Sequence, residues 1–278
     1  MRAPVLLAAA AAGLLVAGGV AVVAHDRGVP GETGTGRAVA AQAHAAPATA
    51  PAAAPPAAAP PGGPPGWALA SAVASGPPDG WVATLSAPVT WSSAPGGPPS
   101  GTLAATDPFG AAQVLGLVGR PRPDGWGLAE LPVRPNGTTG WVQVSLPQVT
   151  LATTPYRVSV SVSARTLTVT DAGAVVLQTP VAVGSPRTPT PTVTTYVWEL
   201  VRPDQPDGGY GPYILGLAEF SDTYATFNGG NAQIGIHGTD LPASIGTATS
   251  HGCIRVPDDV VTRLAGLLPL GTPVVVAA

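Results

Sequence analysis

The chain is 278 residues long, which is enough for one large or two small globular domains once any tails are set aside. Its formal net charge is −3 and only 10% of its residues are charged, a balance that does not favour nucleic-acid binding or an acidic partner. Glycine (36 residues) and proline (34 residues) both exceed ordinary usage, so part of the chain is expected to be low in complexity or dense in turns.

The first 24 residues are typical of a membrane-targeting segment. Arg2 is followed by an uncharged, mildly apolar run that ends at Ala24. This pattern fits a cleaved signal peptide or an uncleaved anchor, since about 20 apolar residues can span a bilayer. We expect the rest of the chain to work outside the cytoplasm. Residues 25–66 lack apolar periodicity and end in a tract of Pro, Ala and Gly, which predicts a disordered, extended linker.

Residues 67–150 predict a small all-β module that resembles a bacterial SH3-type barrel. Short strand-like runs alternate with turn signals, and the strongest of these signals, Asn136-Gly137, predicts a tight hairpin. The aromatic side chains here could bind sugar or peptide, although packing in the core of a small barrel is the more ordinary use of tryptophan. Five of the six tryptophans of the chain lie in this region: Trp67, Trp81, Trp91, Trp126 and Trp141.

Residues 154–278 predict a second domain, again mainly β. Val158, Val160 and Val162 alternate with serines, which is the pattern of a half-buried strand. A hairpin is expected over residues 167–178 with its turn at 171–173, and a further strand over 192–201. Pro257, followed by two acidic residues, predicts the start of a helix with one apolar face, and residues 273–276 predict a closing strand.

Cys253 is the only cysteine of the chain, so no internal disulfide can form and a reactive thiol becomes a candidate. His237 and His251 are its nearest histidines, and a thiol becomes a nucleophile when an imidazole accepts its proton. Gly252 removes side-chain bulk beside the sulfur, and the backbone N–H groups here could stabilise an oxyanion. Arg255 lies on the same face as Cys253 if the segment is extended, and could bind a carboxylate.

Two other interpretations of these residues stay open at this point. His237, His251 and Cys253 are all metal-ligand types, but a structural zinc site usually needs four ligands and the sequence offers no obvious fourth. We therefore expect neither a metal nor a cofactor. The remaining alternative is a buried cysteine beside two incidental histidines, because free cysteine is often buried.

The segments Ile-Gly-Ile-His-Gly-Thr (234–239) and Ser-His-Gly-Cys-Ile-Arg (250–255) closely resemble the signature of the L,D-transpeptidase (YkuD-like) family. That signature is a histidine, a short loop, then Ser/Thr-His-Gly-Cys with Arg or Asn two residues later. Residues 181–184 and 188–192 also resemble the family's strand and Pro-rich turn, although Val193 stands where a glycine is frequent. The resemblance covers about residues 154–278. It implies a YkuD-like β-sandwich with a short helix.

The resemblance implies a cysteine acyltransferase that acts on bacterial peptidoglycan in the cell envelope. Cys253 would attack the carbonyl that precedes the terminal D-alanine of a donor stem tetrapeptide, forming a thioester. The side-chain amine of a neighbouring acceptor stem would then resolve the thioester and create a 3–3 cross-link. The family also implies that carbapenem-type β-lactams acylate Cys253.

The family signature assigns a role to each residue around the thiol. His237 corresponds to the general base, His251 shapes the site and supports the oxyanion region, and Ser250 is expected to orient an imidazole. Gly252 keeps the approach to the sulfur open. The predicted substrate-binding positions are Arg255, for a carboxylate, and Gly238, whose backbone carbonyl helps to orient the base.

Other functions remain as alternatives. An L,D-carboxypeptidase would form the same thioester and let water resolve it. Papain-like enzymes place Cys before His, and sortases lack Ser-His-Gly-Cys, so both fit the order of His237 and Cys253 less well. A non-catalytic wall-binding protein would use the 67–150 module instead. Contact with a membrane is expected only through the first 24 residues.

Overall fold

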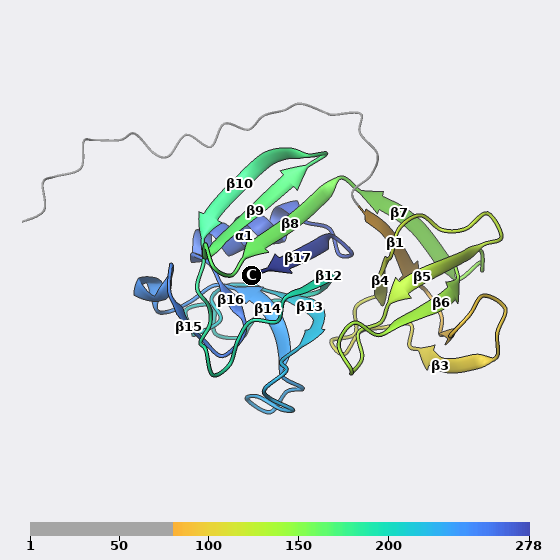
Figure 1. Cartoon of the computed structure of the whole chain (residues 1–278), viewed down its shortest axis with the longest axis horizontal. Helices are drawn as coiled ribbons and strands as arrows, with labels where there is room; N and C mark the ends of the chain where they lie inside the picture. The colour runs from red at the N-terminus through yellow and green to blue at the C-terminus, as the bar shows by residue number, and fades with distance from the viewer. Residues whose placement is uncertain (1–79) are drawn as a thin grey trace, which may run out of the picture. The chain divides into compact units, whose positions relative to one another are not determined.

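The computed structural model describes residues 80–278, which all fall within one compact unit. The predicted targeting segment, the linker and the start of the first module, residues 1–79, lie outside the described residues. The described part is mainly β with one α-helix, α1 (Asp258–Leu267), which confirms the predicted fold class (Figure 1). In this part no helix has both the length and the apolar character that a membrane crossing requires.

Residues 80–154 form a seven-stranded sheet in which every paired neighbour is antiparallel. Alternate strand residues such as Leu85, Leu115 and Val142 fill a core of their own, and Trp81 and Trp91 pack partly buried against it. β7 pairs with β1 along its whole length, so this sheet reaches Thr154. In spatial order the strands are β3 (Pro99–Leu103), β2 (Val89–Ser92), β6 (Thr139–Gln143), β5 (Trp126–Glu130), β4 (Val114–Leu117), β1 (Gly80–Leu85) and β7 (Val149–Thr154).

The connection between β5 and β6 differs from the tight hairpin expected at Asn136-Gly137. β5 and β6 are neighbours, but residues 131–138 separate them. Gly137 has a φ of +72° in a turn closed by the Thr138 N–H to the Pro135 carbonyl at 3.3 Å. The prediction of a tight hairpin at Asn136-Gly137 is therefore wrong, because the side chain of Asn136 hydrogen-bonds to a residue that is far along the chain. Its amide accepts from the Phe220 N–H at 3.1 Å and donates to the Phe220 carbonyl at 2.7 Å.

Residues 156–277, in the predicted second domain, build an eight-stranded mixed sheet. Its strands run in the order β10 (Ala174–Pro180), β9 (Thr166–Asp171), β8 (Tyr156–Ser161), β17 (Pro273–Ala277), β12 (Val193–Val201), β13 (Ile214–Phe220), β14 (Gln233–His237) and β16 (Ile254–Arg255). The β8–β17 and β14–β16 pairs are parallel. β11 (Val183–Gly184) and β15 (Ala248–Ser250) form a separate parallel pair, and Pro242–Ser244 is a short 3-10 helix.

The predicted elements of this domain are confirmed within one or two residues. In β8, Val158 and Val160 are buried and Ser159 is exposed. The β9–β10 turn is Ala172-Gly173, with φ of +46° and +86°, which is the left-handed pair that a two-residue hairpin requires. Pro257 is the N-cap of α1, and Leu264 on its apolar face joins the main core.

A loop of the first sheet holds the segment that connects β13 to β14, residues 221–232, which we call the flap. The Arg134 guanidinium donates to three flap carbonyls: Ser221 at 3.0 Å, Tyr224 at 2.9 Å and Asn231 at 3.2 Å. Together with the Asn136–Phe220 bonds, these contacts fasten the flap to the 131–138 loop.

Strands β5, β12 and β13 each carry one buried glutamate. Glu130, Glu199 and Glu219 are only 8%, 4% and 1% exposed. Burial is the first cause that raises the pKa of each carboxyl, from 4.5 to about 7. Neighbouring carboxylates add to the effect, Asp107 for Glu199 and Glu130 for Glu219.

These raised pKa values predict that stability falls as pH rises from about 4.5 to about 7. In that window the folded form keeps the protons that the unfolded chain has lost, so the free energy of unfolding decreases with pH and levels off above 7. Urea unfolding at several pH values should show a shallower fall in Glu219→Gln, by on the order of 1–3 kcal/mol. Identical pH profiles for the wild type and this variant would contradict the assignment.

Candidate active site

Cys253 lies in a tight turn between β15 and β16. Gly252 has a φ of +122°, a conformation that favours glycine, and a side chain there would press on Ile234. The Ser250 hydroxyl donates to the Cys253 carbonyl at 2.6 Å and accepts from the Gly252 N–H at 3.1 Å. Ser250 therefore closes the turn that carries the nucleophile; these contacts differ from the expected one with an imidazole.

The Pro-rich loop after β11 braces the same turn. The Thr188 hydroxyl donates to the Ser250 carbonyl at 3.0 Å, and the Thr190 hydroxyl donates to the Gly252 carbonyl at 2.8 Å. Gly184 allows this close approach, because a side chain there would collide with the backbone of residues 188–190. The sequence pattern located this loop but did not reveal that its two threonines hold the nucleophile's turn.

His237 ends β14 and is 3% exposed. Its Nδ1 lies 2.6 Å from the Gly238 carbonyl. Since a carbonyl can only accept, Nδ1 carries the hydrogen and Nε2 keeps a lone pair for an incoming proton. Burial lowers the pKa of His237 to about 4, a net shift that the bond to the Gly238 carbonyl opposes and the nearby Arg255 cation assists. The imidazole is therefore neutral at pH 7, as a base must be.

The first turn of α1 fixes the backbone that orients this base. The Asp258 carboxylate accepts from the Thr239 N–H at 2.8 Å. Gly238 and Gly211 leave room for that carboxylate, because a Cβ at either position would collide with it. The carboxylate thus holds the peptide whose carbonyl binds Nδ1 of His237. In the sequence Asp258 showed only as a helix-initiating acid.

The thiol itself is also neutral. Cys253 is half-buried, and its Sγ lies 3.9 Å from the Gln233 carbonyl, which is the hydrogen-bond partner of the sulfur in the described chain. Burial raises the pKa of the thiol above its ordinary value, and the Gly235 backbone N–H and then the Arg255 cation only partly offset this. A preformed thiolate–imidazolium pair is therefore disfavoured, and the thiol proton must move to His237 as the sulfur attacks.

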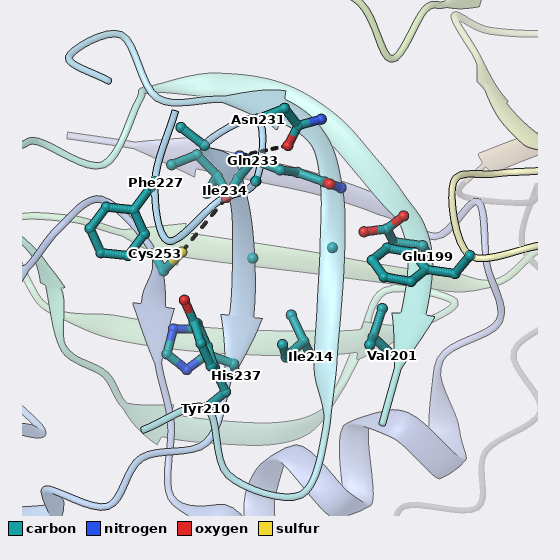
Figure 2. A pocket seen from close by; sticks show the side chains of 15 residues that line it. Glu199, Val201, Tyr210, Ile214, Phe227, Asn231, Gln233, Ile234, His237 and Cys253 are labelled. Carbon is teal, nitrogen blue, oxygen red and sulfur yellow. Dashed lines mark hydrogen bonds between the residues drawn. The ribbon is translucent and has the colours of Figure 1, made fainter. Parts of the chain in front are cut away.

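Two cavities meet at the sulfur. One, of about 170 Å³, extends from Cys253 past Ile214 to Glu199, as Figure 2 shows. The other, of about 220 Å³, extends toward His251 and Arg255. Both are lined by Tyr210, Phe227, His237 and Cys253. The candidate nucleophile thus borders two cavities, one lined by the carboxyl group of Glu199 and the other by the guanidinium of Arg255.

The other predicted residues lie around the second cavity. Arg255 lines it, and its Nε is buried without a hydrogen-bond partner within residues 80–278. His251 is exposed and packs on the flap, with ring centroids 5.2 Å from Phe227 and 6.3 Å from Tyr224. The Gly252 N–H is already bonded to Ser250, which makes the N–H of Cys253 the better candidate for an oxyanion.

The expected absence of a metal rests on the sequence. Among the described residues, no group of three or more His, Cys, Asp or Glu side chains is close enough to hold a metal ion.

The family model of the L,D-transpeptidase catalytic domain, YkuD, matches residues 155–276, the segment that carries both His237 and Cys253. The “Putative L,D-transpeptidase YkuD” of Bacillus subtilis is 40% identical over 124 residues, which is 45% of this chain and 67% of the relative. Its namesake in Bacillus licheniformis is 38% identical over 122 residues, 44% of this chain and 66% of the relative. The chain belongs to the L,D-transpeptidase (YkuD) family.

Solved structures with the same description are similar over part of the chain. The catalytic domain of the Enterococcus faecium L,D-transpeptidase is 26% identical, with a TM-score of 0.34 over 44% of this chain and 95% of that one. The Mycobacterium smegmatis L,D-transpeptidase is 18% identical, with a TM-score of 0.37 over 60% and 91%. LdtMt1 in complex with imipenem is 18% identical, with a TM-score of 0.40 over 59% and 91%.

The neutral thiol predicts a particular pH dependence of alkylation. The rate at which iodoacetamide modifies Cys253 should rise about tenfold per pH unit and keep rising beyond pH 9, because burial raises the pKa of the thiol. The chain has one cysteine, so mass spectrometry reads this rate without masking other thiols. A rate that is already constant below pH 7 would instead indicate a preformed ion pair.

Proposed function

We propose that the protein is an exported peptidoglycan L,D-transpeptidase that forms 3–3 cross-links through a thioester on Cys253. The observation that carries the proposal is the open thiol between two cavities, which both also border a neutral imidazole whose Nδ1 is bonded to Gly238. Family membership gives this arrangement its substrate class. Export is supported by the targeting pattern of the first 24 residues.

In the first half-reaction, Sγ of Cys253 attacks the carbonyl carbon that precedes the terminal D-alanine of the donor stem. The thiol proton passes to Nε2 of His237, and the Cys253 N–H supports the oxyanion of the tetrahedral intermediate. The amide C–N bond then breaks and His237 returns the proton to the departing amine of D-alanine. A carbonyl–sulfur bond, the thioester, replaces the amide. To reach the imidazole, the thiol rotates away from the Gln233 carbonyl.

In the second half-reaction, the side-chain amine of an acceptor stem attacks the thioester. It loses a proton to His237, the C–S bond breaks as His237 returns that proton to the sulfur, and a new amide links the two stems. Once D-alanine has left, the cavity that Arg255 lines gives the acceptor amine an approach to the thioester. Water in place of the amine would give the carboxypeptidase reaction from the same thioester.

Arg255 is the proposed partner for the carboxylate of the D-alanine that leaves. Arg255 lines the cavity beside Cys253, and its buried Nε has no hydrogen-bond partner among the described residues. A guanidinium can bind a carboxylate through two parallel hydrogen bonds. A terminal D-alanine carries its carboxylate one residue from the bond that breaks, which matches a cation beside the nucleophile.

Loss of the nucleophile or of the base tests the reaction. Cys253→Ala should abolish product, and His237→Ala should lower the rate of thioester formation by roughly 10²–10⁴-fold, the usual contribution of a general base. Incubation with a purified disaccharide-tetrapeptide, followed by mass spectrometry, measures both cross-linked dimer and free D-alanine. Thermal unfolding of each variant serves as the control for folding.

Each product pattern decides between the alternatives. Dimer from the wild type supports the transpeptidase, whereas shortened peptide without dimer supports the carboxypeptidase. A Cys253→Ala protein that still releases D-alanine would refute the thioester mechanism.

Acylation by a β-lactam provides an independent test of the thiol. Among similar solved structures, one is of a complex with imipenem and another is of an avibactam carbamoyl enzyme. A strained lactam carbonyl presents the thiol with an activated acyl donor, so imipenem should add one covalent adduct at Cys253. Intact-mass spectrometry should show this adduct in the wild type and not in Cys253→Ala. Acylation at another residue would contradict the prediction.

A further inference from the structure

The cavity that leads away from Cys253 toward β12 ends in a buried carboxylate that the mechanism above does not use. Glu199 is 4% exposed and lines the same cavity as Cys253 and His237. Its Oε2 is buried without a hydrogen-bond partner in the described chain, although the Gln233 side chain lies against the carboxyl group. Figure 2 shows the carboxylate and the sulfur on opposite sides of the cavity. A buried acceptor with an empty position is a site for a donor.

Glycines keep the path between the sulfur and Glu199 open. A Cβ at Gly216 would lie 2.6 Å from the Cγ of Glu199 and 2.7 Å from the side-chain nitrogen of Gln233. A Cβ at Gly235 would lie 3.1 Å from Ile214. Any larger residue at Gly216 would therefore displace the carboxylate or its neighbour.

The charge at this end of the cavity selects a cation. Glu199 is the one acidic residue in the lining, Arg is absent from it, and the only basic side chain, His237, is neutral at pH 7. The nearby Asp107 carboxylate makes the potential more negative, and burial together with Asp107 raises the pKa of Glu199 to about 7. A cation bound beside Glu199 would offset the free-energy cost of ionising this buried carboxyl group, because it pairs with the carboxylate.

The walls and the volume select an aminoalkyl group in particular. The apolar side chains of Val201, Ile214 and Phe227 line the same cavity. Its volume of about 170 Å³ corresponds to roughly five water-sized groups at about 30 Å³ each. A straight side chain of four or five methylene-sized groups that ends in an ammonium fills this space.

We propose that Glu199 is a specificity-determining residue that binds the side-chain ammonium of the donor's diamino acid, the residue whose carbonyl becomes the thioester on Cys253. The proposal rests on the proposed function, since it needs an acyl group on the sulfur. In the thioester, the carbon that bears this side chain is bonded to the carbonyl on the sulfur. From there the side chain extends along the cavity to Glu199.

The two cavities then define the direction in which the donor binds. The ammonium of the acyl residue lies toward Glu199 and the carboxylate of the departing D-alanine lies toward Arg255. A donor bound in reverse places each charge near a group of the same sign. The opposite charges on the two sides of Cys253 therefore select both the side chain and its orientation.

A matched pair of donors tests the proposal on the full chain. The two tetrapeptides differ in their third residue, which is lysine in one and 6-hydroxynorleucine in the other, so a hydroxyl replaces the amine at the same length. The rate of Cys253 acylation is measured by intact-mass spectrometry for the wild type, for Glu199→Gln, and for Glu219→Gln as a control that removes another buried carboxyl. We expect the wild type and the control to prefer lysine by about 10- to 100-fold, the range for a hydrogen bond to a charged group, and Glu199→Gln to lose that preference.

The rate for the hydroxyl donor should be similar in all three proteins, which separates lost recognition from a damaged site. Retention of the lysine preference in Glu199→Gln, or an equal loss in Glu219→Gln, would overturn the proposal. Imipenem acylation of the same proteins distinguishes the two levels of failure. A wild type that imipenem and both donors leave unmodified disproves the proposed function, whereas acylation without discrimination between the donors disproves only the role of Glu199.

Discussion

The parallel pairing of β14 with β16 is the constraint on which the site depends. Only two residue pairs define it, Ile236 with Ile254 and His237 with Arg255. This register places His237, at the end of β14, beside the strand that follows the turn of Cys253. A one-residue slip would turn His237 to the opposite face of the sheet. The buried isoleucines on both strands therefore pack in the core and also hold His237 in its position relative to β16.

Around this pair, the protein keeps the reacting groups neutral and places its charges at a distance. Burial lowers the pKa of His237 and raises that of Cys253, so neither ionises before substrate arrives. The formal charges, Arg255 and Glu199, lie on different cavities. Such a site resembles a serine-type arrangement, in which proton transfer accompanies attack, more than a thiolate–imidazolium pair. A low-dielectric centre between two charges would also strengthen their interactions with the zwitterionic donor that we propose.

The sequence predicted what is encoded locally. Alternation revealed β8, the turn signal at 171–173 revealed the β9–β10 hairpin, and the motif brought His237 and Cys253 together. It could not reveal Glu199, because a bulge in β12 near that residue shifts its register against β13 and no local pattern records which face results. Asn136 misled for a related reason: its turn propensity is genuine, but the side chain bonds to Phe220, far along the chain. Contacts between distant segments decided both outcomes.

Because of the bonds from Arg134 and Asn136, residues of both sheets hold the wall of the candidate active site in place. Phe227, which borders both cavities, belongs to a flap whose carbonyls at Ser221 and Tyr224 are held by Arg134. The family-matched segment, 155–276, contains the reacting atoms but not the arginine that fastens their enclosure. The first sheet is therefore more than a tethered accessory, because its Arg134 and Asn136 hold the segment that carries Phe227.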